Sequence, residues 1–252
     1  MHQLRTYVGM VSSDWNQCLA PCGPFDAIAF RYPELESELA DIFQQYTANR
    51  MTLTTATQHI RARIPAPLSA TDMDAYLASR FEMYPGVTDL IAWCDRNQIL
   101  FMINTTGPLG YFQRALAAGL LPEVPVLSAH PFIGFPSPGE GQPLLYELNE
   151  ITDKALNSAK AAGYFGIPLP NIIVMGDSGG DGPHFEWAAG VGATTIGSML
   201  KPSLAEYCRA RAIEIQHCFG HAYAKGERVA PEKERRYNFL DLSKVIGRVL
   251  AL

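Results

Sequence analysis

The segment NIIVMGDSGGD, residues 171–181, decides the fold of this chain. Four successive apolar residues, 172–175, lead into a glycine-rich turn that carries two carboxylates, Asp177 and Asp181. A short apolar run without polar alternation is typical of a strand buried on both faces of a parallel sheet. Because α/β folds collect their functional side chains at the carboxyl ends of such strands, the segment predicts a functional site at this sheet edge.

Similar runs occur on either side of this segment, and helical patterns separate them. Short apolar stretches bounded by Gly, Pro or polar residues predict strands over 99–104, 125–129, 171–176 and 193–198, and residues 5–13 predict a further strand that leads into Asp14. Apolar residues at helical spacing predict helices over 86–98, 108–118, 152–165, 182–190 and 241–251. This alternation predicts an α/β fold with a doubly wound parallel sheet.

Residues 25–84 interrupt the alternation, because helix follows helix there without a convincing strand. An apolar stripe from Leu35 to Tyr46 is followed by helical patterns over 51–62 and 71–82, and Ser69 with Asp72 predicts a capping box. We therefore expect a small helical domain inserted after the first strand. Its expected bounds are 21–84, with hinges near 20–24 and 83–87 and an α/β core of 1–20 and 85–252.

Composition narrows the class of protein. The chain has 252 residues, a net charge of −5 and 48% hydrophobic residues, so it can bury a large core. The acidic balance argues against a nucleic-acid partner, and we expect neither membrane insertion nor a signal peptide, hence a cytoplasmic location. The five cysteines are an odd and sparse number, which favours reduced thiols over a disulfide framework. The segment from Cys208 through His217-Cys218 to His221 only loosely resembles a zinc site, and scattered residues are the better interpretation.

Four polar signals lie at predicted strand ends or helix starts: Asp14-Trp15-Asn16, Asn104-Thr105-Thr106-Gly107, Lys154 and the acidic turn 176–181. Their order and spacing resemble those of the haloacid dehalogenase (HAD) superfamily of hydrolases across essentially the whole chain. That family has D-x-D-x-T after its first strand, Ser or Thr after the second, then a Lys, then G-D-x-x-x-D. Lys154 is the first lysine of the chain and precedes Asp177 by 23 residues, whereas its rival Lys160 is closer.

The resemblance implies hydrolysis of a small phosphorylated or anionic metabolite through an aspartyl-phosphate on Asp14. In that scheme Lys154 holds the charges of nucleophile and phosphate, and the hydroxyl of Thr105 binds a phosphoryl oxygen. Thr106 is the alternative for that hydroxyl. Neither the identity of the metabolite nor the oligomeric state can be read from the sequence.

The cofactor implied by the resemblance is Mg2+, a hard cation that prefers oxygen ligands. The implied ligands are the carboxylates of Asp14, Asp177 and Asp181 and the backbone carbonyl of Asn16. Two carboxylates on one loop would repel each other without a cation. Their presence therefore favours a metal over the metal-free chemistry of the dehalogenases.

Asn16 is the main departure from the family pattern, which has a second Asp at this position. That Asp serves as general acid and base, a role worth ~10²–10⁴-fold in rate, and an amide cannot fill it. Two alternatives to a phosphatase therefore stay open. One is a catalytically degenerate protein that binds a phosphate ligand or a protein partner, and the other is a specialised hydrolase that does not need the second Asp.

For four other side chains we expect packing or solvent-exposed positions rather than a role in the site. Trp15 should pack between the helical domain and the core, and His184 should lie at the surface or against the helical domain. Arg61 and Arg63 have the chemistry to clamp an anion, but solvated positions are favoured for both.

Overall fold

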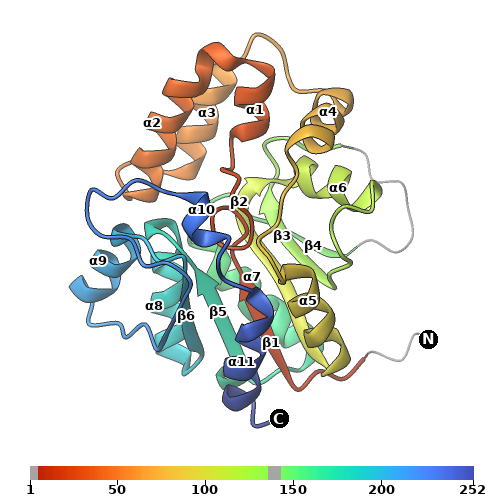
Figure 1. Ribbon diagram of the computed structural model, residues 1–252, viewed down its shortest axis with the longest axis vertical. Coiled ribbons are helices and arrows are strands. Elements are labelled where there is room, and N and C mark those ends of the chain that lie inside the picture. The colour runs from red at the N-terminus through yellow and green to blue at the C-terminus, as the bar shows by residue number, and fades with distance from the viewer. Residues whose placement is uncertain (1–4, 136–142) are drawn as a thin grey trace.

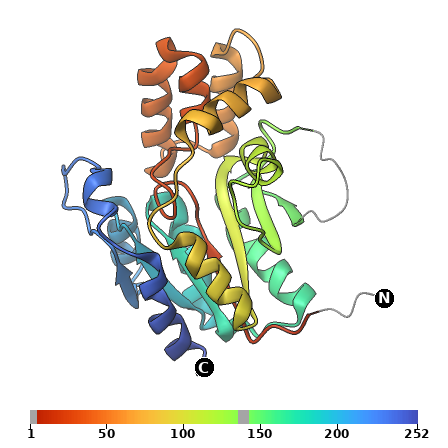
Figure 2. The same ribbon diagram turned by 45° about the vertical axis from the view of Figure 1, so that its right-hand side comes forward.

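The computed structural model describes residues 5–135 and 143–252, and it contains one parallel sheet with helices on both faces (Figures 1 and 2). The order of the seven described strands is β4-β3-β2-β1-β5-β6-β7, and every described pairing is parallel. The strands are β1 (Gly9–Ser13), β2 (Ile99–Pro108), β3 (Val126–His130), β4 (Leu144–Glu147), β5 (Ile172–Gly176), β6 (Thr194–Ser198) and β7 (His217–Phe219). The predicted α/β class with a doubly wound parallel sheet is confirmed.

The two edge strands, β4 and β7, were not anticipated from the sequence. β4 alternates half-buried and exposed residues, and β7 is three residues long and partly exposed. Neither forms the continuous apolar run by which a fully buried strand is recognised. β7 contains His217 and Cys218, while the imidazole of His221 bonds to Glu227 at 2.8 Å.

The helices begin close to where the sequence pattern placed them. They are α1 (Asp26–Arg31), α2 (Glu36–Thr47), α3 (Leu53–Arg63), α4 (Ala70–Arg80), α5 (Val87–Arg96), α6 (Leu109–Ala117), α7 (Asp153–Phe165), α8 (Gly182–Val191), α9 (Pro202–Ala210), α10 (Pro231–Glu234) and α11 (Ser243–Val249). The short helices α1, α9 and α10 were not predicted. No helix in the described part of the chain is long and apolar enough to span a bilayer.

Alternate residues of the central strands face two separate apolar layers. On β1, Val11 packs in the layer that contains α5 and α6, whereas Met10 packs in the layer of α7, α8 and α9. On β5, Ile173 and Val174 divide in the same way. Because successive side chains of a strand point to opposite faces, an apolar run is needed wherever both faces are covered. This explains why the central strands lack polar alternation.

Helices α1–α4 form an insert between β1 and β2, and they lie beyond the carboxyl ends of the strands (Figures 1 and 2). The predicted capping box opens α4: the amide of Asp72 donates to Ser69 Oγ at 3.1 Å, and the amide of Ser69 donates to Asp72 Oδ2 at 2.9 Å. Such a box satisfies two backbone donors that the helix itself cannot.

Polar contacts fasten the insert to the sheet domain. The guanidinium of Arg114 on α6 donates twice to Asp74 on α4, at 2.7 Å each. The carboxylate of Glu150 accepts from the first amides of α3, those of Leu53 and Thr54, at 2.9 and 3.0 Å. A carboxylate at a helix N-terminus is stabilised by the helix dipole. The structure thus has the insert seated on the strand ends, and whether it moves as a separate lid stays a prediction.

The C-terminal segment reaches the second expected hinge. Glu234 is fully buried and accepts from the hydroxyls of Tyr84 and Tyr223, the latter at 2.7 Å. The next residue, Arg235, donates from Nη2 to Glu82 at 2.8 Å. Residues 82–84, which connect the insert back to the core, are therefore held by a segment 150 residues further along the chain.

Candidate active site

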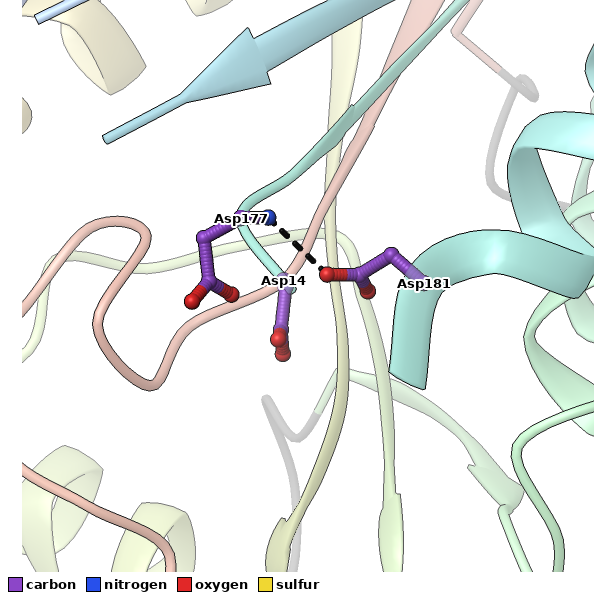
Figure 3. A group of neighbouring side chains, drawn as sticks. All are labelled: Asp14, Asp177 and Asp181. Atoms are coloured by element: carbon purple, nitrogen blue, oxygen red, sulfur yellow. Dashed lines mark hydrogen bonds between the residues drawn. The ribbon is translucent and has the colours of Figure 1, made fainter. Parts of the chain in front are cut away.

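The carboxylates of Asp14 and Asp177 meet because β1 and β5 are neighbouring strands. Ser13 pairs with Met175, and the amide of Asp14 donates to the Met175 carbonyl at 3.0 Å, so the residues that follow both strands leave the sheet together. Asp181 comes from the turn after β5. Ligand oxygens of the three aspartates lie within 4.8 Å of one another, and all three side chains are buried (Figure 3).

Asp181 is fixed by the backbone of its own turn. Its Oδ2 accepts from the amide of Asp177 at 2.9 Å, the dashed line of Figure 3, and from the amide of Ser178 at 3.3 Å. A Cβ on Gly176 would lie 2.5 Å from Asp181 Cγ, so this close approach needs glycine at the end of β5. The glycine-rich turn is therefore a rigid support for one carboxylate.

Lys154 supplies the first positive charge of the cluster. It lies in the first turn of α7, is 1% exposed, and places its Nζ 3.2 Å from Asp14 Oδ1 and 2.5 Å from Asp181 Oδ1. Burial lowers the pKa of Lys154, but the two carboxylates outweigh this effect and raise the pKa above its ordinary value. Lys160, on the same helix, is exposed.

A second lysine, Lys201, was missed in the sequence. It precedes α9, its ammonium pairs with Asp177 Oδ2, and its amide donates to the Asp177 carbonyl at 2.8 Å. A signal was present, since Lys201 follows the predicted strand 193–198 and so lies at the same sheet edge as Asp14.

The cluster of three aspartates and two lysines has a formal charge of −1 when all five groups are ionised. Burial raises the pKa of Asp177 to about 7 against the influence of Lys201, and burial also raises the pKa of Asp14 despite Lys154. The buried Asp177 Oδ1 has no hydrogen-bond partner among the described residues. Converging hard oxygen donors with excess negative charge and an unpaired carboxylate oxygen fit a divalent cation.

The two candidate threonines face different neighbours. The hydroxyl of Thr105 donates to Asn16 Oδ1 at 3.0 Å, accepts from the amide of Gly107 at 3.1 Å, and lies near enough to Asp14 to oppose part of the rise that burial causes in the pKa of Asp14. The hydroxyl of Thr106 instead bonds to the phenol of Tyr46 at 3.0 Å. Thr105 therefore lies with Asp14 and Asn16, whereas Thr106 lies toward the insert.

The side chain of Asn16 is held at both ends. Its Oδ1 accepts from Thr105, and its Nδ2 donates to the Cys22 carbonyl at 3.3 Å. The next residue, Gln17, has φ of +57°, the left-handed conformation for which glycine is usual. The turn after β1 therefore has a backbone shape to which glutamine is poorly suited.

His184 corrects one expectation. It was expected at the surface or against the insert, but it is fully buried beneath the site, with Nε2 2.9 Å from Ser158 Oγ and its ring stacked on Trp187. The first turn of α8 faces the sheet, so its polar side chain enters the core. Burial, together with the charge of Lys154, lowers the pKa of His184 to about 3.

The remaining candidates lie between the insert and the core or within the insert. Trp15 is fully buried, with ring centroids 6.5 Å from Phe81 and 5.7 Å from Phe112, which confirms its expected place. Arg63 is exposed and pairs with Glu38 at 2.9 Å inside the insert. Arg61 is exposed too, but its guanidinium lies over the ring of Phe132 at 5.1 Å, on the far side of the insert–core boundary.

No family model and no curated protein matches this chain by sequence. Solved structures do match its fold. A phospho-aspartyl intermediate analogue of phosphoserine phosphatase superposes with a TM-score of 0.66 at 15% identity, covering 95% of this chain and 99% of its own. A HAD family hydrolase from Salmonella enterica serovar Typhi gives 0.65 at 18% identity, covering 97% and 73%. A hydrolase from Pseudomonas syringae gives 0.53 at 14% identity, covering 95% and 98%. The chain therefore has the phosphatase-like α/β fold of the HAD superfamily.

Proposed function

We propose that this protein is a Mg2+-dependent hydrolase of small phosphate monoesters that works through an aspartyl-phosphate on Asp14. The observation that carries the proposal is the convergence of three buried carboxylates and Lys154 at the carboxyl ends of β1 and β5. A buried carboxylate beside an ammonium is kept available as a nucleophile, and the ammonium can also attract the substrate's charge.

The candidate metal ligands are the carboxylates of Asp14 and Asp177 and the backbone carbonyl of Asn16. The hydrogen bonds that close the turn after β1 run through the carbonyls of Trp15 and Ala20 rather than through that of Asn16. Asp181 is the third candidate carboxylate ligand, and its oxygens also accept from the amides of Asp177 and Ser178 and pair with Lys154. Bound Mg2+ would offset the charge of the phosphoryl oxygens and so favour attack by an anion.

Three residues of the site then have distinct tasks. Asp14 attacks phosphorus, and Lys154 holds the Asp14 carboxylate in place while balancing charge on the transferred group. Thr105, whose hydroxyl already lies with Asn16 and Asp14, donates to a phosphoryl oxygen. The insert keeps bulk water away from the acyl phosphate until the leaving group has departed.

Two cavities lie near the turn that follows β1. Beside Asn16 and Gly107 the structure has a cavity of about 10 Å³, whereas a cavity of about 670 Å³ opens next to Gln17, between the first hinge and the insert. The substrate phosphate must reach Asp14, and in the proposed function the insert or the first hinge moves to admit it. We accordingly retain 21–84 as the proposed cap, with its hinges at 20–24 and 83–87.

The proposal is tested with a set of phosphate monoesters assayed with Mg2+ and with chelator, using the wild-type chain and Asp14→Asn. Hydrolysis that needs Mg2+ and falls by a factor of 10³ or more in Asp14→Asn supports it. The same variant should lose the Mg2+-dependent binding of beryllium trifluoride, a mimic of an aspartyl-phosphate. Activity that survives Asp14→Asn would place the nucleophile elsewhere, and phosphate binding without turnover by the wild type would favour the degenerate alternative.

A further inference from the structure

No residue has yet been assigned to protonate the leaving group in the proposed reaction. An alkoxide leaving group needs a proton as the P–O bond breaks, and Asn16 cannot supply one. Its amide is also fully engaged, with Oδ1 on Thr105 and Nδ2 on Cys22. A proton donor, if the chain has one, must come from another element of the site.

In-line displacement restricts where that donor can lie. The attacking and leaving oxygens stand on opposite sides of phosphorus. Asp14 follows β1, so it attacks from the edge of the sheet. The leaving oxygen then points away from the strands, toward the insert that covers their carboxyl ends (Figure 1). The donor is therefore to be sought on α1–α4.

Tyr46, near the end of α2, occupies such a position. Its hydroxyl lies 3.0 Å from Thr106 Oγ1, next to the threonine that contacts Asn16, and the side chain is 2% exposed. Its ring lies over the acidic turn, since a Cβ on Gly180 would come within 4.0 Å of it. Tyr46 thus spans the two loops that carry Thr105 and Asp177.

The end of α2 is held against that same turn. Asn49 Nδ2 donates to the Gly179 carbonyl at 3.2 Å, and a Cβ on Gly179 would lie 2.3 Å from the carbonyl oxygen of Thr47. Around the ring, Phe25 and Phe43 pack edge-to-face at 6.0 and 5.5 Å. The phenol is therefore positioned by backbone contact on one side and by aromatic packing on the other.

Two other phenols, Tyr76 and Tyr111, line the small cavity beside Asn16, which none of the five cluster residues lines. The charges that act on Tyr76 and Tyr111 belong to the region of Cys22, whereas those acting on Tyr46 include Asp14 and Lys154. Burial raises the pKa of Tyr46, so its phenol carries its proton at neutral pH.

We propose that Tyr46 is the proton donor to the leaving group, in place of the missing second Asp. As Asp14 forms its bond to phosphorus, the bond to the leaving oxygen breaks and that oxygen takes the phenol proton, leaving alcohol, aspartyl-phosphate and a Tyr46 phenolate. Water then attacks phosphorus and gives one proton to the phenolate. This restores Tyr46 and Asp14 and releases hydrogen phosphate. The inference rests on the proposed function.

The test is Tyr46→Phe, assayed with Mg2+ on phosphate monoesters whose leaving groups range from 4-nitrophenol to a simple alcohol such as ethanol. We expect kcat/KM to fall by about 10² or more on ethyl phosphate, within the usual range for a lost general acid, and less than threefold on 4-nitrophenyl phosphate. Tyr76→Phe and Tyr111→Phe are the matched controls and should change both substrates equally. The retained aryl activity reports that the Tyr46→Phe variant is folded.

The outcomes separate the two proposals. An equal loss on both esters, or none on ethyl phosphate, overturns the role of Tyr46 while leaving the hydrolase intact. A tenfold gain on ethyl phosphate in Asn16→Asp alone also overturns it, because it would mean that the wild type has no acid in place. If the wild type hydrolyses none of the esters, the proposed function fails and the role of Tyr46 fails with it.

Discussion

Replacing Lys154 with methionine should reveal how strongly the acidic cluster depends on one ammonium. The side chain is 1% exposed and lies 3.2 Å from Asp14 Oδ1 and 2.5 Å from Asp181 Oδ1. Methionine keeps much of the volume of the stem but leaves both carboxylates without this partner. The perturbation is therefore electrostatic more than steric.

The expected size follows from these distances. At an effective dielectric constant of 20, the attraction between the ammonium and Asp14 alone is about 5 kcal/mol. Removing Lys154 also removes the desolvation cost of its own charge. The free energy of unfolding should therefore fall by about 3–5 kcal/mol, as is typical when a buried ion pair loses one partner. This is a large part of the 5–15 kcal/mol by which domains are usually stable.

The assay is urea denaturation of Lys154→Met and of Lys160→Met, without and with Mg2+. Lys160 lies on the same helix and is exposed, so its variant should stay within about 0.5 kcal/mol of the wild type. Mg2+ should recover part of the stability lost by Lys154→Met, because a cation bound only by the folded state stabilises it. A loss below about 1 kcal/mol, the size of a surface ion pair, would refute the view that this ammonium holds the carboxylates together.

Three further changes test other parts of the structure. Gln17→Gly should raise the free energy of unfolding by about 1 kcal/mol, because φ of +57° is strained for glutamine; an unchanged urea midpoint would mean that the turn stores no strain. His184→Asn should flatten acid unfolding. Between the ordinary pKa of 6.5 and the folded value of about 3, the unfolded wild type binds a proton at His184 but the folded wild type does not. The free energy of unfolding of the wild type therefore falls by up to about 1.4 kcal/mol for each pH unit of acidification. An equally steep acid transition in the variant would contradict this reasoning. Gly179→Ala should displace the insert, since its Cβ would meet the carbonyl oxygen of Thr47 at 2.3 Å, and limited proteolysis should then cleave the insert sooner; Gly180→Ala, which has no contact under 3.9 Å, is the control, and equal cleavage of both variants would count against the close docking.

The sequence was most informative where chemistry and strand ends coincide. Asp14 and Asp177 each follow a segment that the sequence predicts as a strand, and β1 and β5 do bring them together. Lys201 also follows a predicted strand, but it belongs to none of the four motifs, so the motifs did not predict it as a site residue. His184 was misplaced because a polar residue at a helix start resembles a surface residue, and only tertiary packing shows which way that turn faces.

Tyr46 illustrates a different limit of sequence analysis. It belongs to the apolar stripe of α2, and a tyrosine in such a stripe is usually a core residue. Its hydrocarbon part is indeed buried in aromatic packing, while its hydroxyl reaches Thr106 across the boundary between insert and core. Helical periodicity identifies the buried face of a helix, but it cannot identify which buried atom meets the opposite domain.

The central place of β1 in the sheet bears on how the chain matures during synthesis. Gly9–Ser13 is made first, yet its partners on the two sides are about 90 and 162 residues away along the chain. At about 5–20 residues per second, a ribosome needs roughly 10–30 s to supply the strand that covers the second edge of β1. Until then a strand that is fully buried in the finished fold, and that leads directly to Asp14, has at least one open edge, which invites pairing with other chains. The insert, made in that interval, can fold on local helical contacts, whereas the acidic cluster forms only when β5 arrives. A nascent chain halted before residue 172 should therefore depend on chaperones that shield strand edges.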